Sequence, residues 1–280
     1  MDFRSELVGS FSEGSNGNPT IAMIEAAFAH HGMNWRYVNC EVPPDQLEAA
    51  VKGALAMGWR GFNLSIPHKV AVIPLLDGLG ESAEMMGAVN CVVIRDGRMI
   101  GENTDGMGFL TSLRQVVDPQ GKRIVMFGAG GAARAIGVEL ALAGAAAITV
   151  VNRSAARGAP LVDLLNRKTA TRCTLAIWQA GHRLPEATDI VVNATSVGLG
   201  NGDQPLDIAT DSLTERMVVA DVIVDPPDTR FLRDARARGC RVIDGLGMLI
   251  NQGVIGVKLW TGLEADAGVM RRRLEQIFKA

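Results

Sequence analysis

The chain has 280 residues, of which 48% are hydrophobic and 21% charged, and its formal net charge at pH 7 is −2. This length allows one large domain or two of ordinary size, and the composition is that of a globular protein with a sizeable core. A balanced charge without a block of like charges argues against nucleic acid as a partner.

From the sequence we expect neither a secretion signal nor a membrane span. The first residues, MDFRSELVGS, lack a basic segment followed by an apolar run, which a signal peptide would have. The most apolar later stretch contains Glu139 and Gly144 and is better explained as helix, turn and strand. We therefore expect a soluble cytoplasmic protein without membrane contact.

The cysteines and histidines do not predict a metal site. The four cysteines are far apart and form no CxxC pair; they are Cys40, Cys91, Cys173 and Cys240. This pattern suggests neither zinc nor a disulfide framework, which fits a reducing compartment. The adjacent His30 and His31 would point to different faces of a helix. We expect no bound metal.

Short apolar runs alternate with longer amphipathic segments, which predicts an α/β architecture. In the first part of the chain we expect helices at residues 19–32 and 43–58, and a strand at 61–66. Residues 90–101 predict a β-hairpin, because Asp96-Gly97 is a favoured two-residue turn. Lys69 should then lie at the end of a strand, where α/β enzymes gather their chemistry, although a lone lysine there can simply emerge into water.

The sequence pattern changes at Lys122, where a new series of predicted strands and helices begins. Residues 122–154 read as strand, glycine turn, helix and strand, and further strands are predicted at 188–194, 217–224 and 241–244. The tail from Gly245 returns to helical spacing. We predict an N-terminal domain at residues 1–105, a middle domain at 106–243, and C-terminal helices at 244–280 that pack back on the first domain.

The glycine turn after the apolar run RIVMF predicts a dinucleotide site. Gly128, Gly130 and Ala133 satisfy the G-x-G-x-x-G/A spacing, which provides a tight turn, close backbone approach to a pyrophosphate, and close packing of helix on strand. The phosphates would lie at the positive end of the following helix.

The tip of the next strand favours NADP over NAD. An NAD site usually carries Asp or Glu there, whereas this chain has Asn152, followed by Arg153 and Arg157. Two guanidinium groups without a nearby carboxylate suit a 2′-phosphate. The alternative is an ordinary solvated helix start.

Taken together, these motifs resemble those of the shikimate dehydrogenase family, from Gly9 to the end of the chain. The matching segments, in order, are GFNLSIPHK, GAVNCVV, GENTDGMGF, GAGGAAR, NRS, NATSVG and GLGMLINQG. The resemblance implies an α/β fold of two domains flanking a cleft, one an N-terminal substrate domain and the other a doubly wound Rossmann domain. It also implies reversible hydride transfer between NADP(H) and a ring hydroxyl or ketone of shikimate or a related alicyclic hydroxy acid.

The resemblance implies that Lys69 and Asp105 are catalytic and face each other in the cleft. Removing a hydroxyl proton as a carbonyl forms needs a placed side chain, which contributes roughly a hundredfold or more. We assign Lys69 as proton relay and substrate orienter, and Asp105 as the group that binds the reacting hydroxyls and positions the lysine. A purely structural ion pair is the alternative.

The same correspondence predicts the remaining contacts. The substrate-binding residues would be Asn18, Thr20, Ser65, Asn90 and Gln252. The cofactor-binding residues would be Gly128, Ala129, Gly130, Gly131, Ala132, Asn152, Arg153, Ser154, Arg157, Thr195, Val222, Gly245 and Met248.

Two segments depart from the family pattern. The family has a Ser-x-Ser signature that holds the substrate carboxylate, but Asn18 and Thr20 stand at these positions, and Glu13 would repel a carboxylate if it pointed inward. Val224, followed by Asp225, replaces the usual tyrosine at the substrate end. The substrate is therefore open among shikimate, quinate, an amino analogue and another hydroxylated ring acid, and a housekeeping enzyme with a drifted loop is the alternative.

Two other functions are compatible with this fold. One is a non-catalytic sensor of a metabolite or nucleotide, against which the intact Lys69 and Asp105 count. The other is a related folate dehydrogenase, against which the segments NTDG and GMLINQ count. The expected partner is a small hydroxy acid, and the chain would be a monomer or a homodimer.

Overall fold

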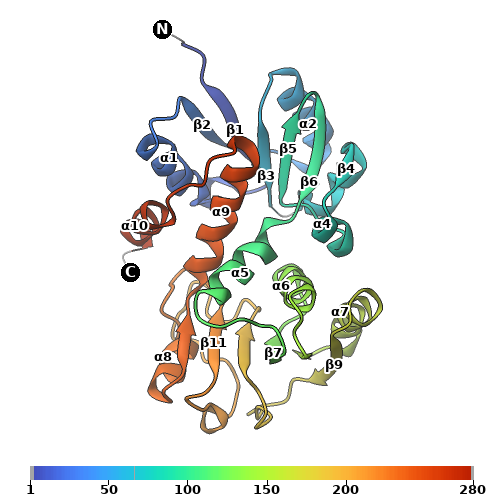
Figure 1. Cartoon of the computed structure of the whole chain (residues 1–280), viewed down its shortest axis with the longest axis vertical. Helices are drawn as coiled ribbons and strands as arrows, with labels where there is room; N and C mark the ends of the chain where they lie inside the picture. Colours follow the sequence, from blue (N-terminus) through green and yellow to red (C-terminus); the bar gives the residue numbers. More distant parts are fainter. Residues whose placement is uncertain (1–2, 66, 279–280) are drawn as a thin grey trace. The chain divides into compact units, whose positions relative to one another are not determined.

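The structure of the protein, a computed structural model, describes residues 3–65 and 67–278. Its contacts divide the chain into two compact units: unit 1 contains residues up to 104 together with 252–277, and unit 2 contains residues 105–251. Each unit has its own six-stranded sheet, and Figure 1 labels most of the strands. The mixed α/β class predicted from the sequence is confirmed.

Unit 1 is built on a mixed sheet. Its strand order is β2-β1-β3-β5-β6-β4, with parallel pairing among β2 (Trp35–Glu41), β1 (Glu6–Ser12) and β3 (Gly61–Leu64). The strands β5 (Cys91–Arg95) and β6 (Arg98–Glu102) form an antiparallel hairpin, and the short β4 (Gly78–Leu79) pairs with β6. The chain enters β2 after α1 (Thr20–His30) and β3 after α2 (Leu47–Ala56).

The hairpin predicted at residues 90–101 is confirmed. Its turn places both Asp96, with φ of 52°, and Gly97, with φ of 73°, in the left-handed region. A two-residue turn of this kind matches the right-handed twist of the flanking strands. The turn therefore fixes the register in which Cys91 pairs with Glu102.

Lys69 does not end a strand, which corrects the sequence-based expectation. The strand β3 stops at Leu64, and Lys69 lies in the short helix α3 (His68–Ala71). Pro67 precedes this helix, and a proline has no N–H to continue a sheet ladder. His68 is buried, and its Nε2 lies 2.8 Å from the carbonyl oxygen of Val42, which fixes the start of the helix.

Unit 2 is a doubly wound parallel sheet. Its order is β12-β11-β10-β7-β8-β9, so the chain begins in the middle and proceeds first to one edge and then to the other. The strands are β7 (Arg123–Phe127), β8 (Ala147–Asn152), β9 (Arg172–Ile177), β10 (Ile190–Asn193), β11 (Val218–Asp221) and β12 (Arg241–Ile243). The predicted Rossmann topology is confirmed.

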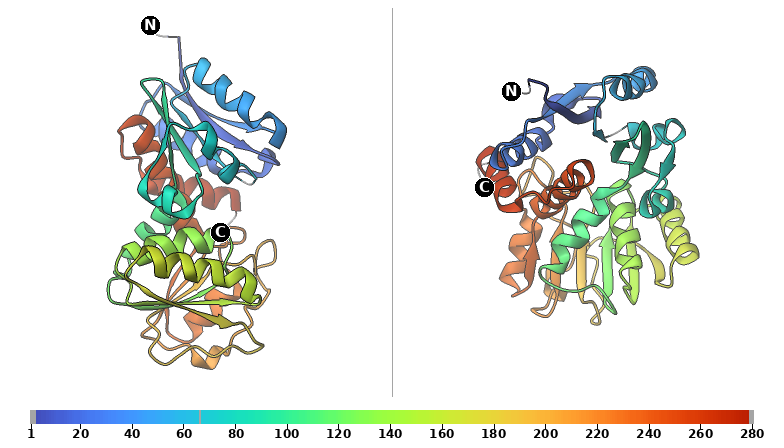
Figure 2. Two further views of the ribbon diagram at one scale, coloured as in Figure 1. Left: turned by 90° about the vertical axis from the view of Figure 1, so that its right-hand side faces the viewer. Right: turned by 45° about the horizontal axis from the view of Figure 1, so that its top comes forward.

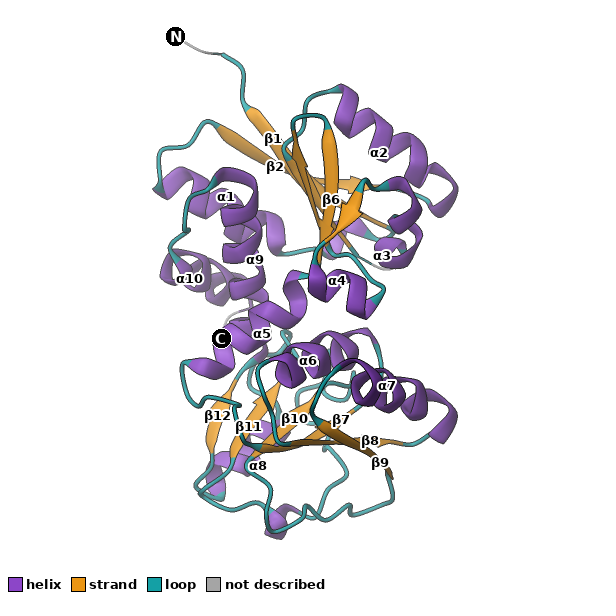
Figure 3. Ribbon diagram, turned by 45° about the vertical axis from the view of Figure 1, so that its right-hand side comes forward, coloured by secondary structure: helices purple, strands orange, loops and turns teal. Residues whose placement is uncertain are grey.

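Helices cover both faces of this sheet. On one face lie α6 (Gly131–Leu142) and α7 (Ala155–Lys168), and on the other lies α8 (Arg230–Ala237) (Figures 2 and 3). The helix α5 (Thr104–Arg114) approaches α6 closely at Gly106, where a Cβ would lie 2.4 Å from the carbonyl oxygen of Ala135. This contact explains the glycine of the NTDG segment.

The C-terminal helices contribute to unit 1 from Gln252 onward. In α9 (Gly245–Thr261), Trp260 Nε1 donates to the carbonyl oxygen of Val92 at 3.0 Å. The helix α10 (Ala267–Phe278) lies beside α1 (Figures 1 and 2), and Asp266 N donates to His31 Nε2 at 3.2 Å. Residues distant in sequence thus complete the first unit.

Over the residues that the structure describes, no helix combines the length and the apolar character needed to cross a membrane. The same residues contain no cluster of three or more His, Cys, Asp or Glu side chains that could hold a metal ion.

Candidate active site

A row of polar side chains crosses three neighbouring strands of unit 1. Ser10 in β1 pairs in register with Asn39 in β2 and with Asn63 in β3, so all three side chains emerge on one face. Ser10 Oγ donates to Asn39 Oδ1 at 2.9 Å, and the hydroxyl of the buried Tyr37 donates to Asn63 Oδ1 at 2.9 Å. Sequence reasoning missed these residues, although each interrupts an apolar strand.

Asn90 and Gln252, which the sequence predicts as substrate-binding, meet through Thr104. Asn90 Nδ2 donates to Thr104 Oγ1 at 3.0 Å, and the backbone N–H of Thr104 donates to Asn90 Oδ1 at 2.6 Å. Thr104 Oγ1 lies 3.4 Å from Gln252 Oε1. All three are buried, and Asn63 Nδ2 donates to the carbonyl oxygen of Asn90, which links this cluster to the row.

Asn18, predicted as substrate-binding, is engaged within the N-terminal loop. Its Oδ1 accepts from the backbone N–H of Thr20 at 3.0 Å, and its Nδ2 donates to Ser10 Oγ at 3.3 Å. Asn39 Nδ2 lies 3.1 Å from the carbonyl oxygen of Asn18 and 3.3 Å from that of Ser15. The row of strand residues therefore holds the loop. Thr20 is buried at the start of α1.

The loop also binds an exposed carboxylate of the protein itself. Glu41, the last residue of β2, accepts the backbone N–H of Gly14 at 2.8 Å and that of Ser15 at 2.7 Å, one on each oxygen. These two backbone bonds, followed by one from the Ser15 hydroxyl, lower the pKa of Glu41. The two N–H groups that could cradle an anion here are thus already satisfied.

The remaining predicted catalytic and substrate-binding residues are Ser65, Lys69 and Asp105. Ser65 follows β3 and is exposed, with its backbone N–H donating to the carbonyl oxygen of Phe11. Lys69 is partly buried, and its carbonyl oxygen accepts the N–H of Val89 at 2.8 Å, one residue before Asn90. Asp105 directly follows Thr104 and belongs to unit 2. Whether Lys69 and Asp105 act as a pair stays a prediction.

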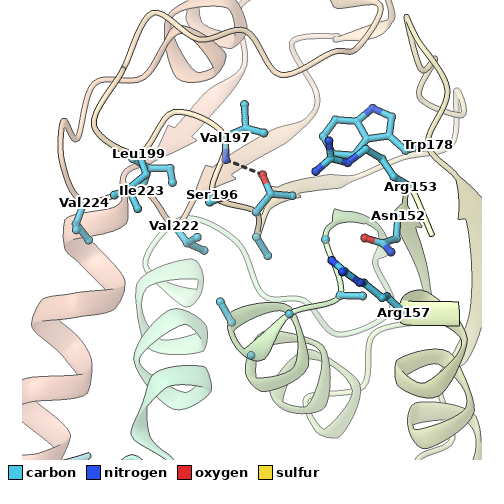
Figure 4. Close-up of a pocket in the computed structure, with 17 residues that line it drawn as sticks. Asn152, Arg153, Arg157, Trp178, Ser196, Val197, Leu199, Val222, Ile223 and Val224 are labelled. Carbon is cyan, nitrogen blue, oxygen red and sulfur yellow. Dashed lines mark hydrogen bonds between the residues drawn. The ribbon is translucent and has the colours of Figure 1, made fainter. Parts of the chain in front are cut away.

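Unit 2 contains a cavity of about 630 Å³ at the carboxyl ends of its strands (Figure 4). Ten of the thirteen residues predicted to bind the cofactor line it, namely Gly128, Ala129, Gly130, Gly131, Ala132, Asn152, Arg153, Arg157, Thr195 and Val222. They come from four separate segments, so the topology assembles what the motifs suggested one by one.

The glycine turn has room for a pyrophosphate. Gly128 has φ of 106°, and a Cβ there would lie 2.7 Å from the carbonyl oxygen of Ala194. Only glycine fits that turn. A Cβ at Gly130 or Gly131 would have no protein atom within 4 Å, so both positions leave open space beside the helix start. Residues of this kind fit a dinucleotide.

The two ends of the cavity differ in chemistry. Figure 4 shows Asn152, Arg153, Arg157 and Trp178 at one end, and the aliphatic side chains of Leu199 and residues 222–224 at the other. Both arginines are exposed and make no ion pair among the residues that the structure describes. Asn152 Nδ2 donates to the carbonyl oxygen of Ser154 at 2.8 Å, which fixes the turn that presents them.

Three predicted cofactor residues do not line this cavity. Ser154 is the N-cap residue of α7. Gly245 begins α9, where a Cβ would lie 2.1 Å from the carbonyl oxygen of Ile223. It therefore permits close packing behind the cavity wall. Met248 lies further along α9 and is partly buried.

Sequence reasoning missed part of the lining. The additional residues are Trp178, Ala194, Ser196, Val197, Leu199, Ile223 and Val224. Most of them belong to the loops after β10 and β11. Thr195 organises the first of these loops, since its Oγ1 donates to Asn193 Oδ1 at 2.7 Å and accepts the N–H of Val197 at 3.1 Å. Val224, predicted at the substrate end, lies at the aliphatic end of this cavity.

A buried carboxylate supports the second loop. Asp221, at the end of β11, accepts Asn193 Nδ2 at 3.0 Å, the backbone N–H of Ile223 at 3.1 Å and Thr229 Oγ1 at 2.7 Å. Burial, partly offset by these hydrogen bonds, raises the pKa of Asp221 to about 6. The hydrogen bonds fix the backbone that carries residues 222–224.

Three family models match the chain. The model of the shikimate dehydrogenase substrate binding domain matches residues 18–92, that of shikimate / quinate 5-dehydrogenase residues 112–200, and that of the shikimate 5′-dehydrogenase C-terminal domain residues 245–275. A shikimate dehydrogenase (NADP(+)) of Methanopyrus kandleri is 40% identical over 97% of this chain and 95% of that protein.

Solved structures are similar over the whole chain. A ligand-free 5-ketofructose reductase of Gluconobacter sp. strain CHM43 is 56% identical, with a TM-score of 0.98, covering 99% of this chain and 100% of that one. A shikimate 5-dehydrogenase from Thermus thermophilus, in complex with NADP(H) and shikimate, is 30% identical, with a TM-score of 0.83, covering 97% and 99%. Together with the two sheets, the lined cavity and the family models, these likenesses show that the chain belongs to the shikimate/quinate dehydrogenase family.

Proposed function

We propose that this member of the family reduces a neutral polyhydroxy ketone of the 5-ketofructose type with NADPH, and oxidises the corresponding alcohol in reverse. The chain is an oxidoreductase that acts on a hydroxyl group and uses NADP, as its curated relatives do. The N-terminal loop, in which this chain departs from the family pattern, bears on which substrate the oxidoreductase accepts.

The observation that carries the proposal is the exposed carboxylate of Glu41, which accepts two backbone N–H groups of this loop. A substrate carboxylate needs hydrogen-bond donors or a cation to replace its water. The N–H groups of Gly14 and Ser15 are taken up by Glu41, and Asn18 is occupied by Ser10 and Thr20. A second carboxylate here would meet a like charge and few free donors. A neutral substrate avoids both costs.

The side chains of unit 1 suit such a ligand. Ser10, Asn39 and Asn63 bring hydroxyl and amide groups to one face, and Asn90 and Gln252 add two buried amides. These groups bond to one another and to their neighbours, so a neutral ligand would exchange one neutral hydrogen bond for another without burying a charge. Groups of this kind donate and accept hydrogen bonds without charge, as the hydroxyls and carbonyls of a keto sugar do. The 56% identity to a 5-ketofructose reductase supports the same substrate class.

The proposed chemistry follows the family pattern. NADPH, when bound, supplies the hydride to the carbonyl carbon. Lys69 donates the proton that the carbonyl oxygen takes up, and Asp105 orients Lys69 and the adjacent hydroxyl. Asn90 and Gln252, joined through Thr104, hold the ring or chain hydroxyls in place.

Shikimate is the second candidate, because curated relatives that are 37% to 42% identical are named as shikimate dehydrogenases. In that case Asn18 and Thr20 would replace the two serines of the family. This requires Asn18 Nδ2 to leave Ser10 and turn to the substrate.

The test compares the two substrates with the same purified protein. NADPH oxidation by 5-ketofructose and NADP reduction by shikimate and quinate are measured as kcat/KM, with K69A as the catalytic control. We expect the ketone to be favoured by about a thousandfold, the size typical when a buried charge lacks a partner. A higher kcat/KM with shikimate would overturn the proposal.

A further inference from the structure

We propose that Trp178 forms the wall of the subsite for the adenine of NADP. Trp178 belongs neither to the glycine motif that begins at Gly128 nor to the pair of Arg153 and Arg157. The inference rests on NADP as cofactor and is independent of the substrate.

Trp178 stands between two adjoining cavities of unit 2. It lines the cavity of about 630 Å³ described above, and it also lines a neighbouring cavity of about 220 Å³. Arg153 and Val197 line both as well. The remaining walls of the smaller cavity are Gln179, Ala180, Gln204, Pro205 and Asp207. The indole thus borders a slot that extends the cavity beyond Arg153.

The indole is held in place before any ligand arrives. Its Nε1 donates to the carbonyl oxygen of Asp207 at 2.9 Å, and its ring centroid lies 5.0 Å from that of Phe127. Phe127 is fully buried and directly precedes Gly128 of the glycine turn. The carboxylate of Asp207 also accepts the N–H of Gly181 at 2.9 Å, which ties down the segment after Trp178. A fixed aromatic face loses little freedom on binding.

The covalent structure of NADP assigns the adenine to this end. The 2′-phosphate is on the ribose that carries adenine, and Arg153 and Arg157 are the cations of the cavity that suit it. Figure 4 shows the indole beside Arg153, at the end opposite to Val222 and Val224. With the pyrophosphate at the glycine turn, the nicotinamide extends toward the aliphatic end, and adenine toward Trp178.

Stacking on an aromatic ring is tolerant of exact base position and adds affinity that charge pairing cannot supply. The loss of one such contact lowers base affinity by about tenfold to a hundredfold. Trp178 would therefore strengthen the adenosine part of the cofactor, whereas Arg153 and Arg157 select the phosphate.

The experiment measures fragment binding to the full chain, and W178A and W178F are compared with the wild type. The probes are 2′,5′-ADP, followed by calorimetry, and reduced nicotinamide mononucleotide, followed by its own fluorescence. We expect W178A to weaken 2′,5′-ADP by about tenfold or more, W178F to weaken it by no more than about threefold, and neither to change nicotinamide mononucleotide binding. Binding of 2′,5′-ADP should also quench the tryptophan fluorescence of the wild type, and it should not quench that of W178F.

Three outcomes would overturn the proposal. One is unchanged binding of 2′,5′-ADP to W178A. The second is an equal loss for both fragments, which would show that the indole only supports the fold through Phe127. The third is quenching that persists in W178F, which would place another of the four tryptophans beside the adenine.

Discussion

The two units hold their candidate sites in different ways. In unit 2 the backbone of the turn from Gly128 to Gly131 shapes the part of the cavity that suits a pyrophosphate, and the loops after β10 and β11 form further walls. In unit 1 the site is made of side chains that bond to one another, from Ser10 and Asn39 to Asn90. A backbone-shaped site accepts any ligand with the same phosphates, whereas a side-chain network can change its ligand by a few substitutions. Under the proposed function, this contrast explains how one unit keeps the family cofactor while the other takes a different substrate.

The carboxylates of the two units show the same contrast. Glu41 in unit 1 is at the surface, and its hydrogen bonds lower its pKa. Asp221 in unit 2 also accepts backbone and side-chain donors, but burial dominates and raises its pKa. Glu41 therefore remains ionised at neutral pH at little cost in free energy. The ionised form of Asp221, below the cofactor cavity, is unfavourable.

The largest expected effect is at Lys69. Replacement by methionine keeps the length of the side chain and removes the proton donor, so kcat should fall by at least about a hundredfold. The dissociation constant of NADPH, measured by fluorescence titration, should not change, because Lys69 belongs to unit 1.

K52A serves as the matched control for Lys69, since Lys52 is exposed and pairs with Glu48 on α2. A K69M enzyme with near-normal kcat would remove Lys69 from the chemistry. A parallel loss of NADPH binding would mean that the fall in kcat does not come from proton transfer alone.

The next effect is at the glycine turn. A Cβ at Gly130 meets no protein atom within 4 Å, and φ is −82°, so G130V should leave thermal stability unchanged. The added side chain occupies the space for the pyrophosphate, so the dissociation constant of NADPH should rise by about tenfold or more. Calorimetry checks the binding.

G53A in α2 is the control for the change of backbone entropy, since its Cβ would lie 4.0 Å from the nearest atom, in Met57. Unchanged NADPH binding to G130V would mean that the phosphates do not approach this turn.

A smaller effect is expected in the side-chain network of unit 1. N39A removes the acceptor of Ser10 Oγ and the donor to the carbonyl oxygens of Ser15 and Asn18. The loosened loop should raise KM for the ketone by roughly three- to tenfold, and lower the free energy of unfolding by about 1–2 kcal/mol. NADPH binding should not respond. Steady-state kinetics and urea unfolding measure these quantities.

Asn34 offers a matched control in the same unit. It is exposed, donates to the carbonyl oxygen of Arg4 and accepts from Ser5 Oγ, away from the row of Ser10 and Asn39. N34A should leave KM unchanged. If N34A and N39A shifted KM alike, the row would have no special connection to the substrate.

The contrast between the units also decides what the sequence could predict. Two short local motifs contain the predicted cofactor residues Gly128, Gly130, Arg153 and Arg157. Such motifs can be recognised without knowing the register in which the strands pair. Ser10, Asn39 and Asn63 lie on three strands, and only their pairing puts them on one face. The topology and the hairpin at Asp96 follow from periodicity and turn chemistry, as predicted.

Two further residues show the limit of sequence patterns. The sequence predicts Lys69 at the end of a strand, because the largely apolar run before it is typical of a strand. Pro67 ends that run and precedes the helix that contains Lys69. Trp178 lies after β9 in a segment without any motif, and only the cavity reveals its position beside Arg153. Long-range packing places such residues, so no local spacing indicates them.

The smallest effect is the pH dependence of stability from Asp221. The pKa of Asp221 in the folded protein, about 6, lies above its ordinary value of 3.8. The protonated carboxyl group therefore stabilises the folded protein fully below pH 3.8, and this stabilisation is lost as the pH rises through 6. Between pH 5 and pH 8 this loss amounts to about 1 kcal/mol. D221N cannot ionise, so its free energy of unfolding relative to the wild type should improve by that amount between pH 5 and pH 8, as measured by urea unfolding. D211N is the control, because Arg183 lowers the pKa of the exposed Asp211, which therefore stays ionised throughout this range. Equal pH dependence of D221N and the wild type would mean that Asp221 is charged in the folded protein already at pH 5, and that its hydrogen bonds to Asn193, Ile223 and Thr229 outweigh its burial.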